Sequence, residues 1–410
     1  MQVIKEIDLR DFGEITVFTG DINGDGKIEL VFPQGEDGPD PCPATGFYPH
    51  GKTIRCVTAV NLDGEILWQT GTPMGSGIRK YHGRGPVLVR DLNGDGKAEV
   101  TYVTAVDNNR FMLRQLAGAD GSLIAETETW AAYDIIPANL RGLDSKRDFI
   151  VGDGLRLVFA YDETLVPLWK WHRYYGGGHH HYAEDIEGKG CDDVYIGVGR
   201  YNAAGERIWW RPDLDGVIEQ MPCCPHMDKI EVHRFFGESD EWQALWIGGH
   251  DVACVKALDG ELLWRLPGEH IHRYTLGRFD PQSHDTLIYV SERDVTGPSW
   301  LLEPSGKVLW KKDLGPGQPI TLHGAGENNS DLLIICAPSP GEIPYVMSHT
   351  GEKLAELSFC APQIELSESG KRGDSGYGFH FKAVDIDNDG IDELLVYNRS
   401  RMMVVKADNV

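Results

Sequence analysis

The sequence lacks long apolar stretches. No run among its 410 residues approaches the length of a membrane-spanning helix, and its apolar residues are not spaced as in long amphipathic helices. Both absences argue against a membrane protein and against a helical one. The chain instead has short segments rich in Val, Ile, Leu, Tyr and Trp between turn residues, together with 49 glycines and 11 tryptophans. This composition is typical of an all-β protein.

Basic residues are scarce as well. The chain holds 39 Lys and Arg against 63 Asp and Glu, which gives a formal net charge of -24. A phosphate backbone binds to a basic face, so we expect no nucleic-acid partner, and a polyanionic substrate requires a local basic patch. The sequence contains neither a glycine-rich phosphate loop nor a Gly-x-Ser-x-Gly elbow, which disfavours nucleotide and serine-hydrolase chemistry.

Two further absences concern location and cysteine chemistry. The first nine residues alternate like a strand and lack the apolar core and cleavage site of a secretory signal. We therefore expect a cytoplasmic protein, or a secreted one whose signal has been removed.

The 8 cysteines have neither zinc-site spacing nor the density of a disulfide-stapled domain. Apolar thiols beside a turn explain Cys223 and Cys224 better than a metal site shared with His226.

One loop pattern recurs three times, at residues 21–29, 91–99 and 385–393. Oxygen-bearing side chains stand at alternate positions, a glycine marks the sharp turn, and a glutamate closes the run. This pattern suits a hard cation, and we expect calcium. The expected ligands are Asp21, Asn23, Asp25, Glu29, Asp91, Asn93, Asp95, Glu99, Asp385, Asp387, Asp389 and Glu393. The alternative is a turn rich in Asp, Asn and Gly that binds no metal.

A second signature recurs beside these loops. It is a turn with glycine or a small polar residue, followed by apolar positions that end in tryptophan or an equivalent. The copies lie roughly 45 to 60 residues apart, which is the period of β-propeller blades. They occupy residues 63–68, 120–125, 162–169, 205–209, 259–264, 305–310 and 350–354. Pairs of further strands are expected around residues 14–33, 84–105, 133–152, 181–198, 228–248, 272–291, 319–338 and 378–397.

The strand pairs outnumber the second signature by one. After the last pair only one strand remains, Met402 to Lys406, and the N-terminal strand Val3 to Leu9 is the natural candidate to complete that blade. We predict a single domain, residues 1–410, that is an all-β propeller of eight blades closed by its N-terminal strand. Seven blades is the alternative, because the first repeat carries a long insertion, Gln34 to Lys52. No signal for an oligomer is present, so we expect a monomer.

The propeller arrangement predicts which loops share a face. The loops that enter the innermost strands lie with those between second and third strands, whereas the Asp-rich loops lie opposite and are expected to be structural. The former loops gather most of the histidines and several arginines, which predicts a basic pocket at one channel mouth. The substrate-binding candidates are Arg79, Lys80, His180, His226, His272, Arg293, His380 and Arg399. A lone histidine at a strand start has hydrogen-bonded packing as its alternative role. Three successive histidines are not expected to share one metal, since neighbours on a strand point to opposite sides.

These residues resemble a known family. Residues 176–197, where a glycine-rich turn and histidines precede an acidic loop, resemble a stretch of the rhamnogalacturonan lyases of the eight-bladed propeller type. Residues 82–105 and the following 120–125 segment are similar to the early blades of that family, and related seven-bladed propellers cleave ulvan or rhamnose-capped glucuronate chains. The resemblance implies a lyase acting on a uronate-containing oligo- or polysaccharide. The fourth loop, Asp185 to Asp193, departs from the calcium pattern.

A lyase of this class removes the proton beside a uronate carboxylate and expels the oxygen two bonds away. Arginine suits neutralisation of the carboxylate, and we assign this to Arg200, with Arg293 as second choice. Histidine and tyrosine suit the proton transfers. The expected base is His181 or His82, and the expected acid is Tyr175 or His250.

Two other functions fit parts of the sequence. The first is a glycosidase that removes terminal rhamnose, which needs paired carboxylates in the cleft. The loops of the expected pocket offer more His and Arg than Asp or Glu, which disfavours it. The second is a noncatalytic calcium-dependent propeller that binds glycan or protein. That function requires no convergence of His and Arg.

Overall fold

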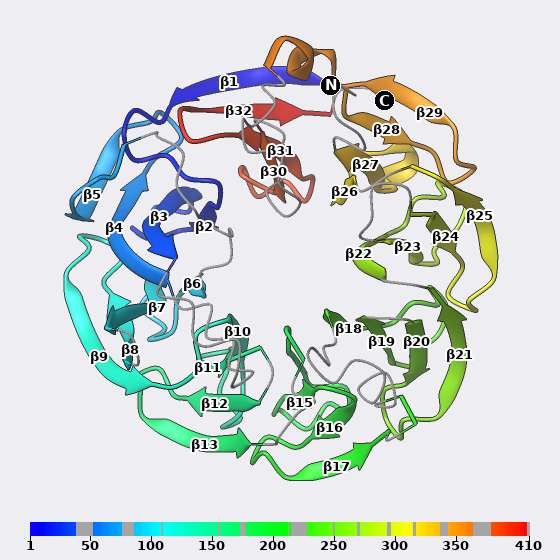
Figure 1. Ribbon diagram of the computed structural model, residues 1–410, viewed down its shortest axis with the longest axis horizontal. Coiled ribbons are helices and arrows are strands. Elements are labelled where there is room, and N and C mark those ends of the chain that lie inside the picture. The colour runs from blue at the N-terminus through cyan, green and yellow to red at the C-terminus, as the bar shows by residue number, and fades with distance from the viewer. Residues whose placement is uncertain are drawn as a thin grey trace.

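Eight four-stranded antiparallel sheets form a ring of blades around a central axis (Figure 1). The computed structural model describes residues 1–37, 52–75, 86–107, 110–154, 156–172, 178–211, 213–214, 228–248, 251–268, 271–292, 297–314, 317–336, 343–363 and 379–407. The prediction of an eight-bladed all-β propeller is confirmed, and the seven-bladed alternative is wrong. Helical structure in the described residues is limited to two short 3-10 turns, η1 (Glu327–Asn329) and η2 (Ser358–Gln363). Within this part of the chain, no helix has the length and hydropathy that a membrane crossing requires.

The first four blades follow one another along the chain, each from its innermost to its outermost strand. They are β2 (Phe18–Gly20), β3 (Glu29–Asp37), β4 (Lys52–Val60) and β5 (Ile66–Gly71); β6 (Val87–Arg90), β7 (Glu99–Asp107), β8 (Arg110–Leu116) and β9 (Leu123–Thr129); β10 (Asp134–Ala138), β11 (Asp148–Gly152), β12 (Leu157–Tyr161) and β13 (Pro167–His172); and β14 (Tyr182–Glu184), β15 (Asp193–Ile196), β16 (Gly199–Tyr201) and β17 (Arg207–Trp210).

The remaining blades continue in the same order, except at the end. They are β18 (Lys229–His233), β19 (Gln243–Gly248), β20 (Asp251–Lys256) and β21 (Leu262–Pro267); β22 (Ile271–Gly277), β23 (Leu287–Glu292), β24 (Ser299–Leu302) and β25 (Val308–Lys312); β26 (Gln318–Leu322), β27 (Leu332–Cys336), β28 (Tyr345–Met347) and β29 (Lys353–Glu356); and β30 (His380–Val384), β31 (Glu393–Tyr397), β32 (Arg401–Lys406) and β1 (Gln2–Asp8). The N-terminal strand β1 pairs antiparallel with β32, from Gln2 opposite Lys406 to Asp8 opposite Arg401. The predicted closure by the N-terminal strand is therefore confirmed.

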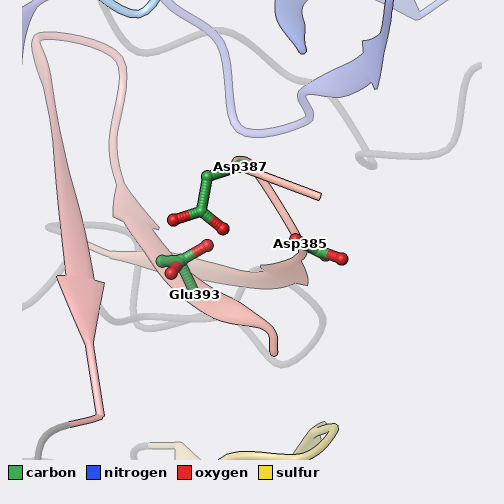
Figure 2. Close-up of side chains that lie close together, drawn as sticks. All are labelled: Asp385, Asp387 and Glu393. Carbon is green, nitrogen blue, oxygen red and sulfur yellow. The ribbon is translucent and has the colours of Figure 1, made fainter. Parts of the chain in front are cut away.

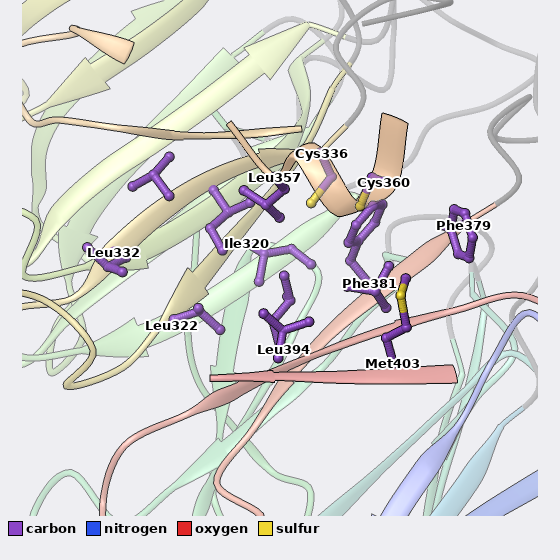
Figure 3. Close-up of a cluster of buried hydrophobic side chains, with 14 residues drawn as sticks. Ile320, Leu322, Leu332, Cys336, Leu357, Cys360, Phe379, Phe381, Leu394 and Met403 are labelled. Atoms are coloured by element: carbon purple, nitrogen blue, oxygen red, sulfur yellow. The ribbon is translucent and has the colours of Figure 1, made fainter. Parts of the chain in front are cut away.

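Apolar cores fill the spaces between neighbouring blades. One such cluster lies between the sheets of β26–β29 and β30–β32 and contains Leu332, Ile334, Leu394 and Met403, all buried (Figure 3). The second strand of each blade is nearly continuous in apolar residues, as in Leu332–Cys336, because both of its faces are covered by neighbouring blades. The cores therefore form a ring of inter-blade layers.

A tryptophan on the outermost strand joins five of the blades to the next one, from β5, β13, β17, β21 and β25. The indole N–H of Trp209 on β17 donates to the carbonyl of Ala257 in the following blade, at 3.2 Å. Trp169 donates to Ala203 at 2.9 Å and Trp264 to Pro304 at 2.7 Å in the same way. The ring of Trp209 also packs beneath the turn glycine Gly260, whose φ of +77° favours a residue without a side chain. The sequence signature of turn glycine and tryptophan is therefore a contact between consecutive blades.

Replacing Gly260→Ala tests this contact. An added Cβ would lie 2.9 Å from ring atoms of Trp209 and would occupy a left-handed backbone position. We expect the free energy of unfolding to fall by about 2 to 4 kcal/mol, measured by urea unfolding. The control is Gly75→Ala, where φ is also +77° but no atom lies within 4 Å of the added Cβ. Equal losses in the two variants would show that backbone strain alone is responsible.

Candidate active site

The innermost strands all begin on one face of the ring, which we call the entry face. Residues 21–29, 91–99 and 385–393 join first to second strands and therefore lie on the opposite face, which we call the Asp-loop face. On the entry face, four consecutive innermost strands begin with polar residues. These are Asp134 on β10, Tyr182 on β14, Lys229 and Glu231 on β18, and His272, Arg273 and Tyr274 on β22. The burial of β18 alternates along the strand, so Lys229 and Glu231 share one side.

Two consecutive histidines contact the same carboxylate. The ring Nδ1 of His180 lies 3.3 Å from Oδ1 of Asp134, and the ring Nδ1 of His181 lies 3.4 Å from Oδ2. The backbone N–H of His181 also donates to Oδ2 of Asp134, at 3.1 Å. Both side chains reach one carboxylate because β14 begins only at Tyr182, so the alternation of a strand does not apply to them. The expectation that neighbouring histidines point apart is therefore wrong at this pair.

The surrounding chain holds the histidines in place. The ring of His179 stacks on Tyr133 with 4.7 Å between ring centres, and its Nδ1 lies 3.0 Å from the carbonyl oxygen of Gly154. A Cβ on Gly152 would lie 2.1 Å from the ring of His181, so only glycine leaves room for that ring. Residues of the preceding blade thus hold the rings of His179 and His181 in place.

The histidines determine the charge of Asp134. Burial alone would raise the pKa of this carboxyl, but the attraction of His180 and the hydrogen bonds of His180 and His181 outweigh burial and hold the pKa well below its usual range. Asp134 therefore stays a carboxylate and orients the imidazole of His180.

A tyrosine and a glutamate form a second pair on the same face. The hydroxyl of Tyr274 donates to Oε1 of Glu231, and the Nζ of Lys229 lies 6.0 Å from the centre of the Tyr274 ring. Burial and the negative charge of Glu231 raise the pKa of Tyr274 well above its ordinary value. Burial also raises the pKa of Glu231, although Tyr274 and Lys229 act against this. Tyr274 is therefore a neutral proton donor beside a lysine cation.

The two pairs belong to one site. Their strands are neighbours, since β10 contacts β14 and β14 contacts β18, and the charges of Tyr182 and Asp134 also act to raise the pKa of Tyr274. The pKa of Tyr182 is raised in turn by burial and by Glu231. The site thus combines a histidine–aspartate pair, a lysine, and tyrosines that hold their protons.

Several predicted site residues lie outside the described residues. These are the predicted catalytic residues His82, Tyr175 and His250, and the predicted substrate-binding residues Arg79, Lys80, His226 and Arg293. Cys223 and Cys224 lie outside them too. Among the described substrate-binding candidates, His180 lies at the site, and His272 lies beside it with its Nε2 3.3 Å from Asp228.

The prediction that Arg200 binds a substrate carboxylate is wrong. Its side chain is 1% exposed and points to the Asp-loop face, where its Nε donates to Asp193 at 3.1 Å. Its terminal nitrogens pair with Asp193 and Glu187 and donate to the carbonyl of Leu258. The turn after β15 contains only Gly197 and Val198, so Arg200 already belongs to β16 rather than to an entry-face loop. Arg200 therefore supplies a positive charge to the fourth acidic loop.

Three other predicted roles change. His181 is 4% exposed, which contradicts a base in contact with substrate, whereas 21% of the His180 side chain is exposed. Arg399 forms an ion pair at 2.7 Å with the buried Glu14, so it joins the last blade to the N-terminal segment instead of meeting a substrate. Burial and the nearby charge of Arg399 lower the pKa of His380 to about 4, so a substrate contact of His380 would be made by a neutral ring.

Sequence reasoning missed four residues of the site. Asp134, Lys229, Glu231 and Tyr274 lie in innermost strands, whereas the predicted site residues come from the loops. Their signal is a charged residue at alternate positions of an otherwise apolar innermost strand, as in Lys229, Glu231 and His233. Lys382 on β30 has the same signal: burial lowers its pKa to about 8, and its Nζ donates to the carbonyl of Val17 at 3.1 Å.

The Asp-rich loops are closed by their own hydrogen bonds. The carboxylate of Asp91 accepts the backbone N–H groups of Gly94 at 2.6 Å and Gly96 at 2.9 Å, and Glu99 accepts that of Leu92 at 2.8 Å. Residues 21–29 repeat this arrangement, with Asp21 and Glu29 in the same roles. Burial and the neighbouring aspartates raise the pKa of Glu29 and Glu99, so a cation would favour the charged form of both. The residue types are those that a hard cation binds, although among the described residues only Asp385, Asp387 and Glu393 bring three acidic oxygens within 4.8 Å of one another.

A lysine of β32 lies beside the third Asp-rich loop, residues 385–393. Asp385, Asp387 and Glu393 place one carboxylate oxygen each within 4.8 Å of one another (Figure 2). The Nζ of Lys406 lies 3.2 Å from carboxylate oxygens of Asp387, Asp389 and Glu393. Lys406 therefore supplies part of the charge that a metal ion would supply.

Fold and site together define an eight-bladed propeller with a polar site at one end of its channel. No protein-family model matches the chain. The rhamnogalacturonan exolyase YesX of Bacillus subtilis (strain 168) is 24% identical over 329 residues, which are 66% of this chain and 51% of that protein. The chain thus spans about half the length of the curated relative that it matches.

Solved structures show the same likeness. The exotype rhamnogalacturonan lyase YesX has a TM-score of 0.69 at 17% identity, covering 97% of this chain and 72% of that one. The rhamnogalacturonan lyase PL11 of Bacillus licheniformis has a TM-score of 0.69 at 16% identity, with the same coverage of 97% and 72%. The chain is therefore a propeller like that of rhamnogalacturonan lyases, which confirms the resemblance seen in its sequence.

Replacing Arg200→Gln tests the structural role of this arginine. The change leaves two carboxylates without their buried partner, so we expect the free energy of unfolding to fall by about 3 to 5 kcal/mol, measured by urea unfolding. The control Arg114→Gln breaks the exposed pair with Glu126 and should cost at most about 1 kcal/mol. Unchanged stability in Arg200→Gln would contradict the structural role.

Proposed function

We propose that this chain is a lyase that cleaves a uronate-containing polysaccharide of the rhamnogalacturonan type by β-elimination. The observation that carries the proposal is that neighbouring innermost strands bring together two pairs of residues and a lysine. The pairs are His180 with Asp134 and Tyr274 with Glu231, and the lysine is Lys229. The names of the related proteins support it, since they are rhamnogalacturonan lyases.

The reaction needs three groups. A base takes the proton from the carbon beside the uronate carboxylate, a double bond forms between that carbon and its neighbour, and the bond from the neighbour to the glycosidic oxygen breaks. A cation must stabilise the carbanion-like transition state by neutralising the carboxylate, and an acid must protonate the departing oxygen. The site contains one residue type suited to each task.

We assign the roles by charge and protonation. Lys229 is the cation that receives the uronate carboxylate. His180 is the base, and the carboxylate of Asp134 orients its ring and stabilises the imidazolium that forms. Tyr274 is the acid, because its raised pKa keeps the proton on its hydroxyl until the oxygen departs, and Glu231 fixes the position of that hydroxyl.

The arrangement favours a lyase over a glycosidase. A glycosidase requires two carboxyl groups that face the sugar, one of them protonated. Here the carboxylate of Asp134 is engaged by two histidines, and that of Glu231 accepts a hydrogen bond from Tyr274. Neither is arranged to attack a sugar or to activate water.

Replacing Tyr274→Phe tests the assignment of the acid. We expect the turnover number on rhamnogalacturonan to fall by about 10²-fold to 10⁴-fold, followed by ultraviolet absorbance of the unsaturated product. The control Tyr195→Phe removes a buried hydroxyl that donates to the carbonyl of Ala257 at 3.3 Å, away from the site, and should leave turnover unchanged. Normal turnover in Tyr274→Phe would refute Tyr274 as the acid, and release of reducing sugar without the chromophore would refute the lyase.

Calcium in residues 21–29 and 91–99 is a second part of the proposal. The bound ion would supply positive charge to Glu29 and Glu99 on the Asp-loop face, and its role would be structural. In residues 385–393 we expect weaker binding, because Lys406 already neutralises part of the acidic charge.

Replacing Asp95→Ala tests this part. We expect the stabilisation by added calcium to fall by about 1 to 3 kcal/mol in thermal unfolding, with turnover below the melting temperature unchanged. The control is Asp120→Ala, because Asp95 and Asp120 each accept the backbone N–H two residues ahead at 2.9 Å, and Asp120 lies in a turn without the calcium pattern. A large loss of turnover with normal melting would place the loop in the chemistry instead.

A further inference from the structure

Trp130 is an exposed tryptophan on a fixed backbone. It is 58% exposed, although its neighbours Thr129 and Ala131 are buried. The hydroxyl of Tyr161 donates to the Thr129 hydroxyl oxygen at 3.0 Å, and the backbone N–H of Tyr133 donates to Gly152 at 2.8 Å. Hydrogen bonds on both sides of Trp130 therefore hold the segment while its indole stays in solvent.

This tryptophan lies on the entry face. It follows the end of β9, and the chain then crosses to the start of β10 at Asp134. Asp134 is four positions after Trp130, so their Cα atoms are no more than about 14 Å apart. A polysaccharide chain bound at the channel mouth would extend across this distance.

An arginine lies at the same end of the blade as the indole. The β8–β9 ladder pairs Phe111 with Thr129, and Arg110 and Trp130 each lie one residue beyond that pair. Trp130 lies one residue past the end of β9, and Arg110 also faces Asp107 of β7. Arg110 and the adjacent Val106 are both exposed. A cation and two apolar groups therefore form a ledge, defined by Val106, Arg110 and Trp130, on an otherwise acidic protein.

We infer that this ledge is a subsite for a uronosyl residue of the substrate chain, outside the channel. The indole face would stack on the C–H face of a pyranose ring, and the guanidinium would bind the sugar carboxylate through its planar fork. The inference rests on the proposed function, because it assigns a second contact to the same polysaccharide. It explains how a protein of net charge -24 holds a polyanion away from its site.

The test compares long and short substrates. For Trp130→Ala and Arg110→Gln we expect KM on polymeric rhamnogalacturonan to rise about tenfold, with the turnover number unchanged, because the subsite contributes binding only. KM for the shortest oligosaccharide that the protein cleaves should not change. Trp130→Phe should restore part of the affinity, since phenylalanine keeps an aromatic face. Quenching of tryptophan fluorescence by the polymer should also be smaller in Trp130→Phe than in the parent protein.

The control is Leu123→Ala. Leu123 lies at the other end of β9 and is 55% exposed, so its loss changes an equally exposed apolar side chain on the Asp-loop face. An unchanged KM on polymer in Trp130→Ala, in a protein that still cleaves, would overturn the subsite and leave the proposed function intact. Absence of both cleavage and binding of uronate glycans in the parent protein would overturn both.

Discussion

Five blades of this propeller are joined to the next blade by a contact between a tryptophan of the outermost strand and a turn of that next blade. The indole of Trp209 both donates a hydrogen bond to Ala257 and fills the space under Gly260, so one side chain sets the distance and the angle between two sheets. Trp169 and Trp264 repeat the contact in other blades. Because the innermost strands are carried by these sheets, the positions of Asp134, Glu231 and Tyr274 at the channel mouth depend on contacts made at the rim.

The fold could be predicted because its signals are local and repeated. Turn glycines, tryptophans and strand pairs each recur along the chain, and the unpaired Met402 to Lys406 strand indicated the N-terminal partner that completes the last blade. A count of repeats determines the number of blades without any knowledge of distances. The one ambiguous element was the insertion in the first repeat, whose described residues belong to β3 and β4.

The site was harder to predict, because it depends on which way single side chains point. Arg200 was assigned to an entry-face loop, but a turn of two residues places it in β16, from which it reaches Asp193 on the opposite face. A difference of one or two residues in the bounds of β16 therefore changed the role of Arg200 from a substrate contact to a structural ion pair. Tyr274 was missed for the opposite reason, since strand residues were assumed to pack and only loop residues were expected to react. The partner of Tyr274, Glu231, lies 43 residues earlier, and no local pattern joins the two.

The pairing of β1 with β32 also constrains how the molecule is made. Gln2 faces Lys406, so the last sheet combines the first and last strands of the propeller, and it can form only after the seven other blades have been synthesised. Until then, β1 has no strand to pair with, and the core between the first and last blades stays open to solvent. Ring closure is therefore the long-range step of folding, with the largest loop to close, while every other blade assembles from contiguous chain. A circular permutant with new termini between two blades would make all eight sheets contiguous and would remove this late step.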